Sequence, residues 1–103
     1  MSPIRKKKLE VIRKKLDKLD NSLISIIKKR TQLVNEVIKL KQYKKEIVDQ
    51  KRIKIILAKI RKKSIQQKID PNITNRIWKN MIWSYINYER KNFNKKYLLT
   101  VRW

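Results

Sequence analysis

The stretch Ile4–Tyr43, IRKKKLEVIRKKLDKLDNSLISIIKKRTQLVNEVIKLKQY, decides the fold of this chain. Two rows run through it at heptad spacing: Leu9, Leu16, Leu23, Arg30 and Val37 in one, and Ile12, Leu19, Ile26, Leu33 and Leu40 in the other. Alternating steps of three and four residues place both rows on one helix face that packs on another helix. Ser2 and Pro3 supply an N-cap and a first helical residue. We therefore expect one helix over about residues 3–43.

The length of this helix predicts a homodimer. At ~1.5 Å per residue it would be roughly 60 Å long. The whole chain has only 103 residues, enough for a single domain, and a chain of this size buries a limited core. A helix that long does not fit inside one compact globule of this size. We expect it to pack against a copy of itself.

Two further helices follow from caps and apolar stripes. Asp49 predicts the start of a helix over about 50–66, and Asp70-Pro71 the start of another over about 71–92. The expected inward residues are Ile53, Ile56, Leu57 and Ile60 in the second helix, and Ile73, Ile77, Trp78, Met81, Ile82, Tyr85 and Ile86 in the third. We expect a short extended tail over 94–103. With no glycine and two prolines, the chain has few turn residues, and the predicted fold class is all-α, in one domain over 1–103.

Composition excludes several kinds of chemistry. The chain has no cysteine and no histidine, so it has no disulfide, thiolate nucleophile, Ser-His-Asp triad or usual zinc ligand set. Catalysis would have to rest on Lys, Arg, Asp, Glu, Tyr or Ser. No apolar run is long enough to span a membrane, and no signal peptide is recognisable. We expect a cytoplasmic protein with no metal and no membrane partner.

Thirty Lys and Arg against eight Asp and Glu give a formal charge of +22. This balance suggests an anionic partner, either nucleic acid, acidic lipid or an anionic metabolite, although many of the lysines can simply be solvated surface. A basic helical module that binds nucleic acid is one interpretation. However, the cations are spread over the chain, and this interpretation does not explain Arg30. Nucleic acid is therefore the less favoured partner.

Arg30 breaks the apolar pattern, because it stands on the seam between Leu23 and Val37. A charge there is costly unless it is paired or a cavity wets it. Lys41 lies eleven residues later, about 20° around the helix and ~16 Å along it, which leaves a gap the size of a small dianion. Arg13 is ~25 Å away along the helix, so only an antiparallel copy could deliver it. Alternatively, Arg30 and Lys41 reach outward to solvent.

Glu89 is the second residue that breaks a pattern. It follows Tyr85 at helical spacing and falls on the apolar stripe of the third helix. A buried carboxyl needs a partner. Either it belongs to a binding site, or it forms an ordinary ion pair with a lysine near the end of the helix.

Several segments resemble the type II chorismate mutases. Residues 12–20, IRKKLDKLD, resemble the L-R-x-x-I-D-x-[IL]-D start of that family, and Lys29-Arg30 resembles its R-R or K-R pair. Lys41 stands at the expected distance. Val48–Arg52 resembles V-x-D-P-x-R, and Arg76–Lys79 resembles R-I-W-R. The resemblance covers roughly residues 9–93.

The resemblance implies a three-helix, intertwined homodimer whose long first helices pair. It also implies the rearrangement of chorismate to prephenate, which needs no cofactor. The resemblance implies that Arg30 and Arg52 bind the substrate carboxylates, together with Arg13 from the partner subunit. It implies that Lys41 donates to the carboxylate and ether oxygen, and that Glu89, which stands where many members have Gln, takes part in catalysis. Asp49 would present a backbone N–H near the ring, and Tyr85 would make a further substrate contact.

One position departs from the family pattern. The residue after the second-helix arginine is normally Glu, which contacts the ring hydroxyl of chorismate, but here it is Ile53. The related isochorismate-pyruvate lyases carry an apolar residue there. Tyr85-Ile86 also resembles part of the third helix of these lyases. A lyase acting on isochorismate in the same pocket is therefore the alternative activity. The net charge is also higher than expected for the family, so an inactive or regulatory homologue is a further possible function.

Overall fold

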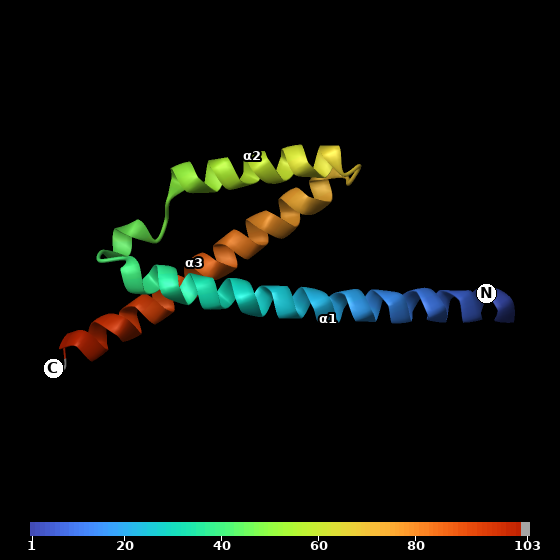
Figure 1. Cartoon of the computed structure of the whole chain (residues 1–103), viewed down its shortest axis with the longest axis horizontal. Coiled ribbons are helices and arrows are strands. Elements are labelled where there is room, and N and C mark those ends of the chain that lie inside the picture. Colours follow the sequence, from blue (N-terminus) through green and yellow to red (C-terminus); the bar gives the residue numbers. More distant parts are fainter. Residues whose placement is uncertain (102–103) are drawn as a thin grey trace. The chain divides into compact units, whose positions relative to one another are not determined.

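A computed structural model describes the backbone of residues 1–101 and the side chains of residues 1–94. In chain order the elements are α1 (Pro3–Leu40), the 3-10 turn η1 (Lys44–Glu46), α2 (Gln50–Gln66) and α3 (Pro71–Val101) (Figure 1). No strand occurs within residues 1–101. The predicted all-α class with three helices and a long first helix is confirmed. No helix in the described part of the chain combines the length and apolar character that a membrane span requires.

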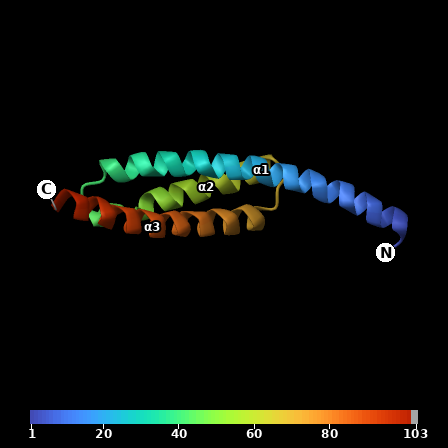
Figure 2. The same cartoon turned by 90° about the horizontal axis from the view of Figure 1, so that it is seen from below.

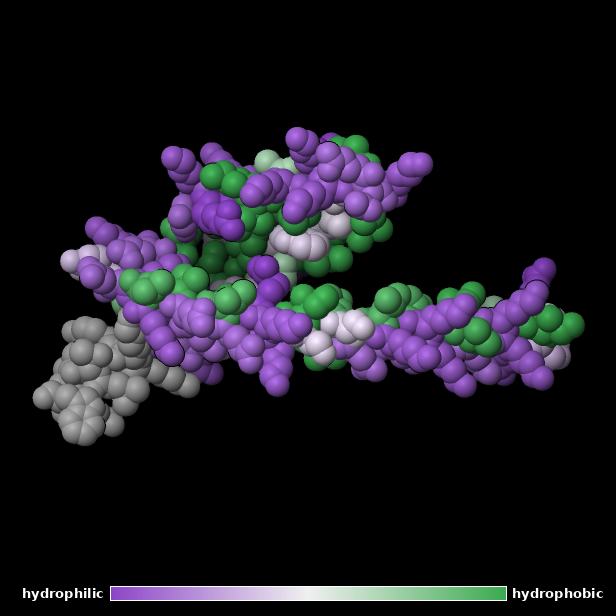
Figure 3. All heavy atoms as spheres, in the orientation of Figure 1, coloured by the Kyte–Doolittle hydropathy of each residue, from purple (hydrophilic) through white to green (hydrophobic). Residues whose placement is uncertain are grey.

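The chain divides into two compact units, Met1–Leu33 and Val34–Trp103. The first unit is a single stretch of α1. The Ser2 hydroxyl oxygen accepts a hydrogen bond from the Arg5 N–H at 3.3 Å, which confirms the predicted N-cap. Apolar side chains line this stretch (Figure 3), and most members of the predicted seam here are more than half exposed, with Leu19 at 65%, while Leu9 is half-buried.

The second unit contains a helical hairpin, because α2 and α3 contact each other (Figure 2) and separate with distance from the turn that joins them (Figure 1). The predicted α2 stripe of Ile53, Ile56, Leu57 and Ile60 is half-buried. Near the turn, Ser64 is buried and its hydroxyl shares a 2.6 Å hydrogen bond with the Thr74 hydroxyl. In the turn after α2, Lys68 lies in the left-handed region at φ 57°, and the Ile69 N–H donates back to the Ser64 carbonyl at 2.8 Å. This bond satisfies a carbonyl that the helix end would leave open.

Two helix ends differ from the predictions. α1 ends at Leu40 rather than near residue 43, although the Lys41 N–H still donates to the Val37 carbonyl at 3.2 Å. α3 continues to Val101, so the predicted extended tail is wrong over 94–101, and residues 102–103 lie outside the described part. The segment 94–101 contains no Pro or Gly to stop a helix.

The predicted inward face of α3 is wrong at its start. Ile73 and Ile77 are 56% and 52% exposed in this chain, while Thr74 and Trp78 are half-buried. Thr74 can lie inward because Ser64 pairs with its hydroxyl. A buried polar group with a partner escapes most of the desolvation cost. Further along, Met81, Ile82, Tyr85 and Ile86 are half-buried or buried, as predicted.

Candidate active site

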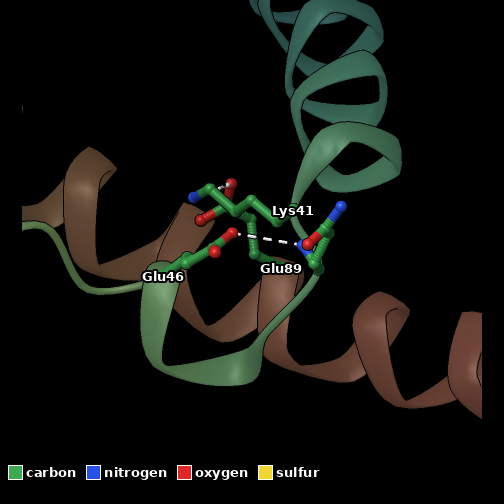
Figure 4. Close-up of polar contacts among 4 residues, drawn as sticks. Lys41, Glu46 and Glu89 are labelled. Carbon is green, nitrogen blue, oxygen red and sulfur yellow. Dashed lines mark hydrogen bonds and ion pairs between the residues drawn. The ribbon is translucent and has the colours of Figure 1, made fainter.

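A partly buried ion pair joins the end of α1 to the middle of α3. The Lys41 Nζ lies 3.2 Å from the Glu89 Oε1, and the two side chains are 19% and 10% exposed (Figure 4). The residues are 48 positions apart in sequence and belong to the same unit. Glu89 as a whole is only 7% exposed, which confirms its predicted place on a buried stripe. Both were predicted site residues, and the structure brings them into direct contact.

The turn after α1 holds Lys41 in place. The Lys41 N–H completes the last helical bond to Val37, and the next N–H, that of Gln42, donates to the Glu46 Oε2 at 3.1 Å (Figure 4). Glu46 belongs to η1, and the following residue, Ile47, is 4% exposed. A carboxylate that accepts from a backbone N–H fixes the path of the chain there. Sequence reasoning missed Glu46, whose signal was a lone acid after Lys44 and Lys45.

On the α3 side, Glu89 is held among packed residues. Ile86 is 4% exposed, and Tyr85 and Tyr88 meet edge to face with ring centroids 6.4 Å apart. The Tyr88 hydroxyl donates to the Asn35 Oδ1 of α1 at 2.6 Å. Neither Asn35 nor Tyr88 was a predicted site residue. Tyr85 was, and it is half-buried one turn before Glu89.

Asp49 and Arg52 lie in the same unit, at the start of α2. The Asp49 Oδ1 accepts from the Arg52 N–H at 3.0 Å, so Asp49 is the N-cap that the sequence predicted. The side chains of both residues are exposed, while Ile53 beside them is half-buried. The first turn of α2 thus presents a guanidinium to solvent next to an apolar side chain.

Arg13 and Arg30 lie on the stretch of α1 that forms the other unit, Met1–Leu33. Both residues are exposed in this chain. Arg30 belongs to the same heptad row as Leu23, and Leu23 is 54% exposed. Each residue therefore lies on a helix surface from which it can reach a ligand or a second chain.

The Lys41–Glu89 pair suits an anionic ligand. An ammonium group has three donors, so one lysine can bind several oxygen atoms at once, including those of a ligand. Partial burial strengthens such bonds relative to bulk water. Among the residues that the structure describes, no three or more carboxylates gather where they could hold a metal ion.

Comparison with known proteins identifies the family. The sequence model described as chorismate mutase type II matches residues 12–90. The chain belongs to this family. A chorismate mutase of Methanocaldococcus jannaschii is 37% identical over 76 residues, which cover 73% of this chain and 77% of that protein. No solved structure matches this chain significantly.

Membership of the chorismate mutase family confirms the resemblance seen in the sequence. The matched region contains Arg13, Arg30, Lys41, Arg52 and Glu89, and it ends before the C-terminal part of α3. The all-helical fold agrees with the type II family, whose members are isomerases. A lyase or a nucleic-acid-binding module is not favoured by these matches.

Proposed function

We propose that this chain converts chorismate to prephenate in a pocket built around Lys41 and Glu89. The observation that carries the proposal is the family match over residues 12–90, which spans every predicted site residue. The contact between Lys41 and Glu89 supports it, because it places two polar side chains from distant parts of the chain at one partly buried position. The cytoplasmic location stays a prediction.

The rearrangement makes few chemical demands. One carbon–oxygen bond breaks and one carbon–carbon bond forms within the same molecule. No proton or electron is transferred to or from the protein, and no cofactor is needed. The protein must hold a compact conformer, so that the carbons to be joined approach each other. It must also stabilise the negative charge that grows on the ether oxygen. A chain without histidine or cysteine can meet both demands.

The charged residues divide these two tasks. Guanidinium groups form paired hydrogen bonds with carboxylates. The dicarboxylate substrate is therefore held by Arg30, Arg52 and Arg13 of the partner subunit. Lys41 and Glu89 stabilise the negative charge that grows on the ether oxygen. When substrate binds, the Lys41 ammonium turns a donor toward the ether oxygen, and the Glu89 side chain lies beside that ammonium group.

Glu89→Gln tests this role of the carboxyl. A Gln side chain keeps the size of Glu and carries an N–H donor, whereas Ala has neither. We expect Glu89→Gln to keep most of the wild-type kcat for chorismate and Glu89→Ala to lose about 10²-fold, because the alanine removes a group at the site of growing charge. Steady-state kinetics with chorismate measure both variants. If Glu89 instead acts as an anion that orients Lys41, Glu89→Gln will lose as much activity as Glu89→Ala.

The central assay follows chorismate consumption by the purified chain and identifies the product. Prephenate is the expected product. Isochorismate is offered to the same sample, because the half-buried Ile53 stands where the family pattern has Glu. Release of salicylate and pyruvate would assign the lyase reaction instead. Activity on neither substrate would overturn the enzyme proposal.

We also propose that the active form is a homodimer joined along α1. Support comes from the exposed apolar seam of the unit Met1–Leu33, where Leu19 and Leu33 are 65% and 61% exposed. Exposed apolar patches of this extent commonly mark an interface. A second copy would cover the seam and bring its Arg13 to the substrate.

Leu19→Glu tests the dimer. A carboxylate on the seam would be buried without a partner, and we expect dissociation to become at least ~100-fold more favourable, about 2.7 kcal/mol. Asn21→Glu is the matched control, because it adds the same side chain and charge on the opposite helix face. Sedimentation velocity measures both, and activity should fall only in Leu19→Glu. A monomeric wild-type chain with full activity would refute the proposal.

A further inference from the structure

The hydrogen bond between Asn35 and Tyr88 lies beside the proposed catalytic pair, and family membership gives neither residue a role. We propose that Asn35 and Tyr88 are positioning residues, whose bond sets α3 against the end of α1 so that Glu89 meets Lys41. The inference rests on the proposed chorismate mutase activity. All four residues lie in the unit Val34–Trp103.

Two contacts at separate points determine how α3 lies. Tyr88 and Glu89 are neighbours, so their side chains leave α3 about 100° apart around its axis. Their partners, Asn35 and Lys41, are six residues apart, about 9 Å along the direction of α1. Each polar contact alone restrains α3 against α1 at a single point. Together the two contacts restrain both rotation and sliding of α3.

The Tyr88 side chain is held at both ends. Its ring packs edge to face on Tyr85, with the ring planes at 90°. Its hydroxyl donates to the Asn35 Oδ1 at 2.6 Å in a partly buried position, where water is a poor substitute for a lost partner. The next residue on α3 is Glu89. A change in the direction of Tyr88 is therefore passed to Glu89 through the rigid helix backbone.

The neighbouring core cannot supply this precision. Ile38 and Ile86 are 5% and 4% exposed, and they contribute burial on α1 and α3. Apolar packing is not directional, whereas a hydrogen bond weakens steeply when its angle changes. The hydroxyl of Tyr88 thus has a function that a phenylalanine ring cannot replace.

Tyr88→Phe removes the hydroxyl and keeps the ring. We expect kcat for chorismate to fall roughly tenfold with KM within about twofold, because small displacements of a catalytic group are costly in the transition state. Tyr43→Phe is the matched control, since Tyr43 is 59% exposed and the chemical change is identical. The control should keep the wild-type kcat.

Asn35 provides an independent test from the other side of the bond. Asn35→Asp keeps an acceptor oxygen for the Tyr88 hydroxyl, and Asn35→Leu removes it. We expect the Asp variant to retain most activity and the Leu variant to match Tyr88→Phe. Should Tyr88→Phe fail to fold, this pair of Asn35 variants decides the matter. Equal activity of the two would overturn the inference.

A double variant separates positioning from general stability. Tyr88→Phe is combined with Glu89→Ala, which has no carboxyl left to position. We expect Tyr88→Phe to cost less than about twofold in this background, against roughly tenfold in the wild-type background. An equal loss in both backgrounds, or no loss in an active wild-type background, would overturn the positioning role alone. A wild-type chain without mutase activity would overturn the proposed function and this inference with it.

Discussion

Lys41→Met is expected to lower kcat for chorismate by about 10²–10³-fold, because it removes a preorganised donor from the position where charge grows in the transition state. Met keeps the length and apolar stem of the side chain, so packing at the end of α1 changes little. Steady-state kinetics with chorismate measure the effect. Lys44→Met, the same change at an exposed position three residues away, should leave kcat unchanged.

The same substitution has a cost in stability. Glu89 loses the partner that lies 3.2 Å away while its side chain stays 10% exposed. Leaving a buried group unpaired costs about 1–3 kcal/mol, which denaturant unfolding will show. Lys41→Met combined with Glu89→Gln removes the uncompensated charge, so we expect it to recover stability but not activity. Recovery of both would mean that Lys41 has only a structural role.

Arg30→Ala is the second change with a large expected effect. We expect kcat/KM for chorismate to fall about 100-fold, or ~2–3 kcal/mol of transition-state stabilisation, because the guanidinium fork is proposed to bind a substrate carboxylate. Arg30→Lys keeps the charge without the fork, and we expect an intermediate loss. Kinetics of both variants, with the oligomeric state measured on the same samples, test the role.

Lys28→Ala is the control for Arg30→Ala, because it removes one positive charge from an exposed position two residues away on another face of α1. An equal loss in both variants would mean that general charge, rather than a specific contact, attracts the substrate. Such a loss would also shrink as salt is added. Near-normal turnover of Arg30→Ala would remove Arg30 from the site.

Helix starts were predictable because caps are local chemistry. Ser2 accepts from Arg5, Asp49 accepts from Arg52, and the Asp70 Oδ1 accepts from the Asn72 N–H at 2.9 Å. Each cap is made by residues two or three positions apart. Helix ends were less predictable, because the chain has no glycine to mark them. After α2 ends at Gln66, Lys68 adopts a left-handed conformation that glycine usually adopts, and α3 passes the predicted end without a break.

The buried place of Glu89 was predictable from periodicity, because one helix face repeats every three to four residues. The environments at the start of that face were not predictable, since the polar Thr74 is half-buried and the apolar Ile77 is exposed. The inward place of Thr74 depends on its hydrogen bond to Ser64, which lies in another helix.

The sequence by itself determined the helical class and the three helix starts, because periodicity and caps are properties of neighbouring residues. Its resemblance to the type II chorismate mutases implied the family and the residues expected to bind a dicarboxylate. Only the tertiary structure decided that Lys41 meets Glu89, that Tyr88 bonds to Asn35 and that Glu46 holds the turn after α1. The first two contacts join residues about fifty positions apart, and they depend on how one helix lies against another. No local pattern encodes that relation, because many helix orientations bury a similar apolar area.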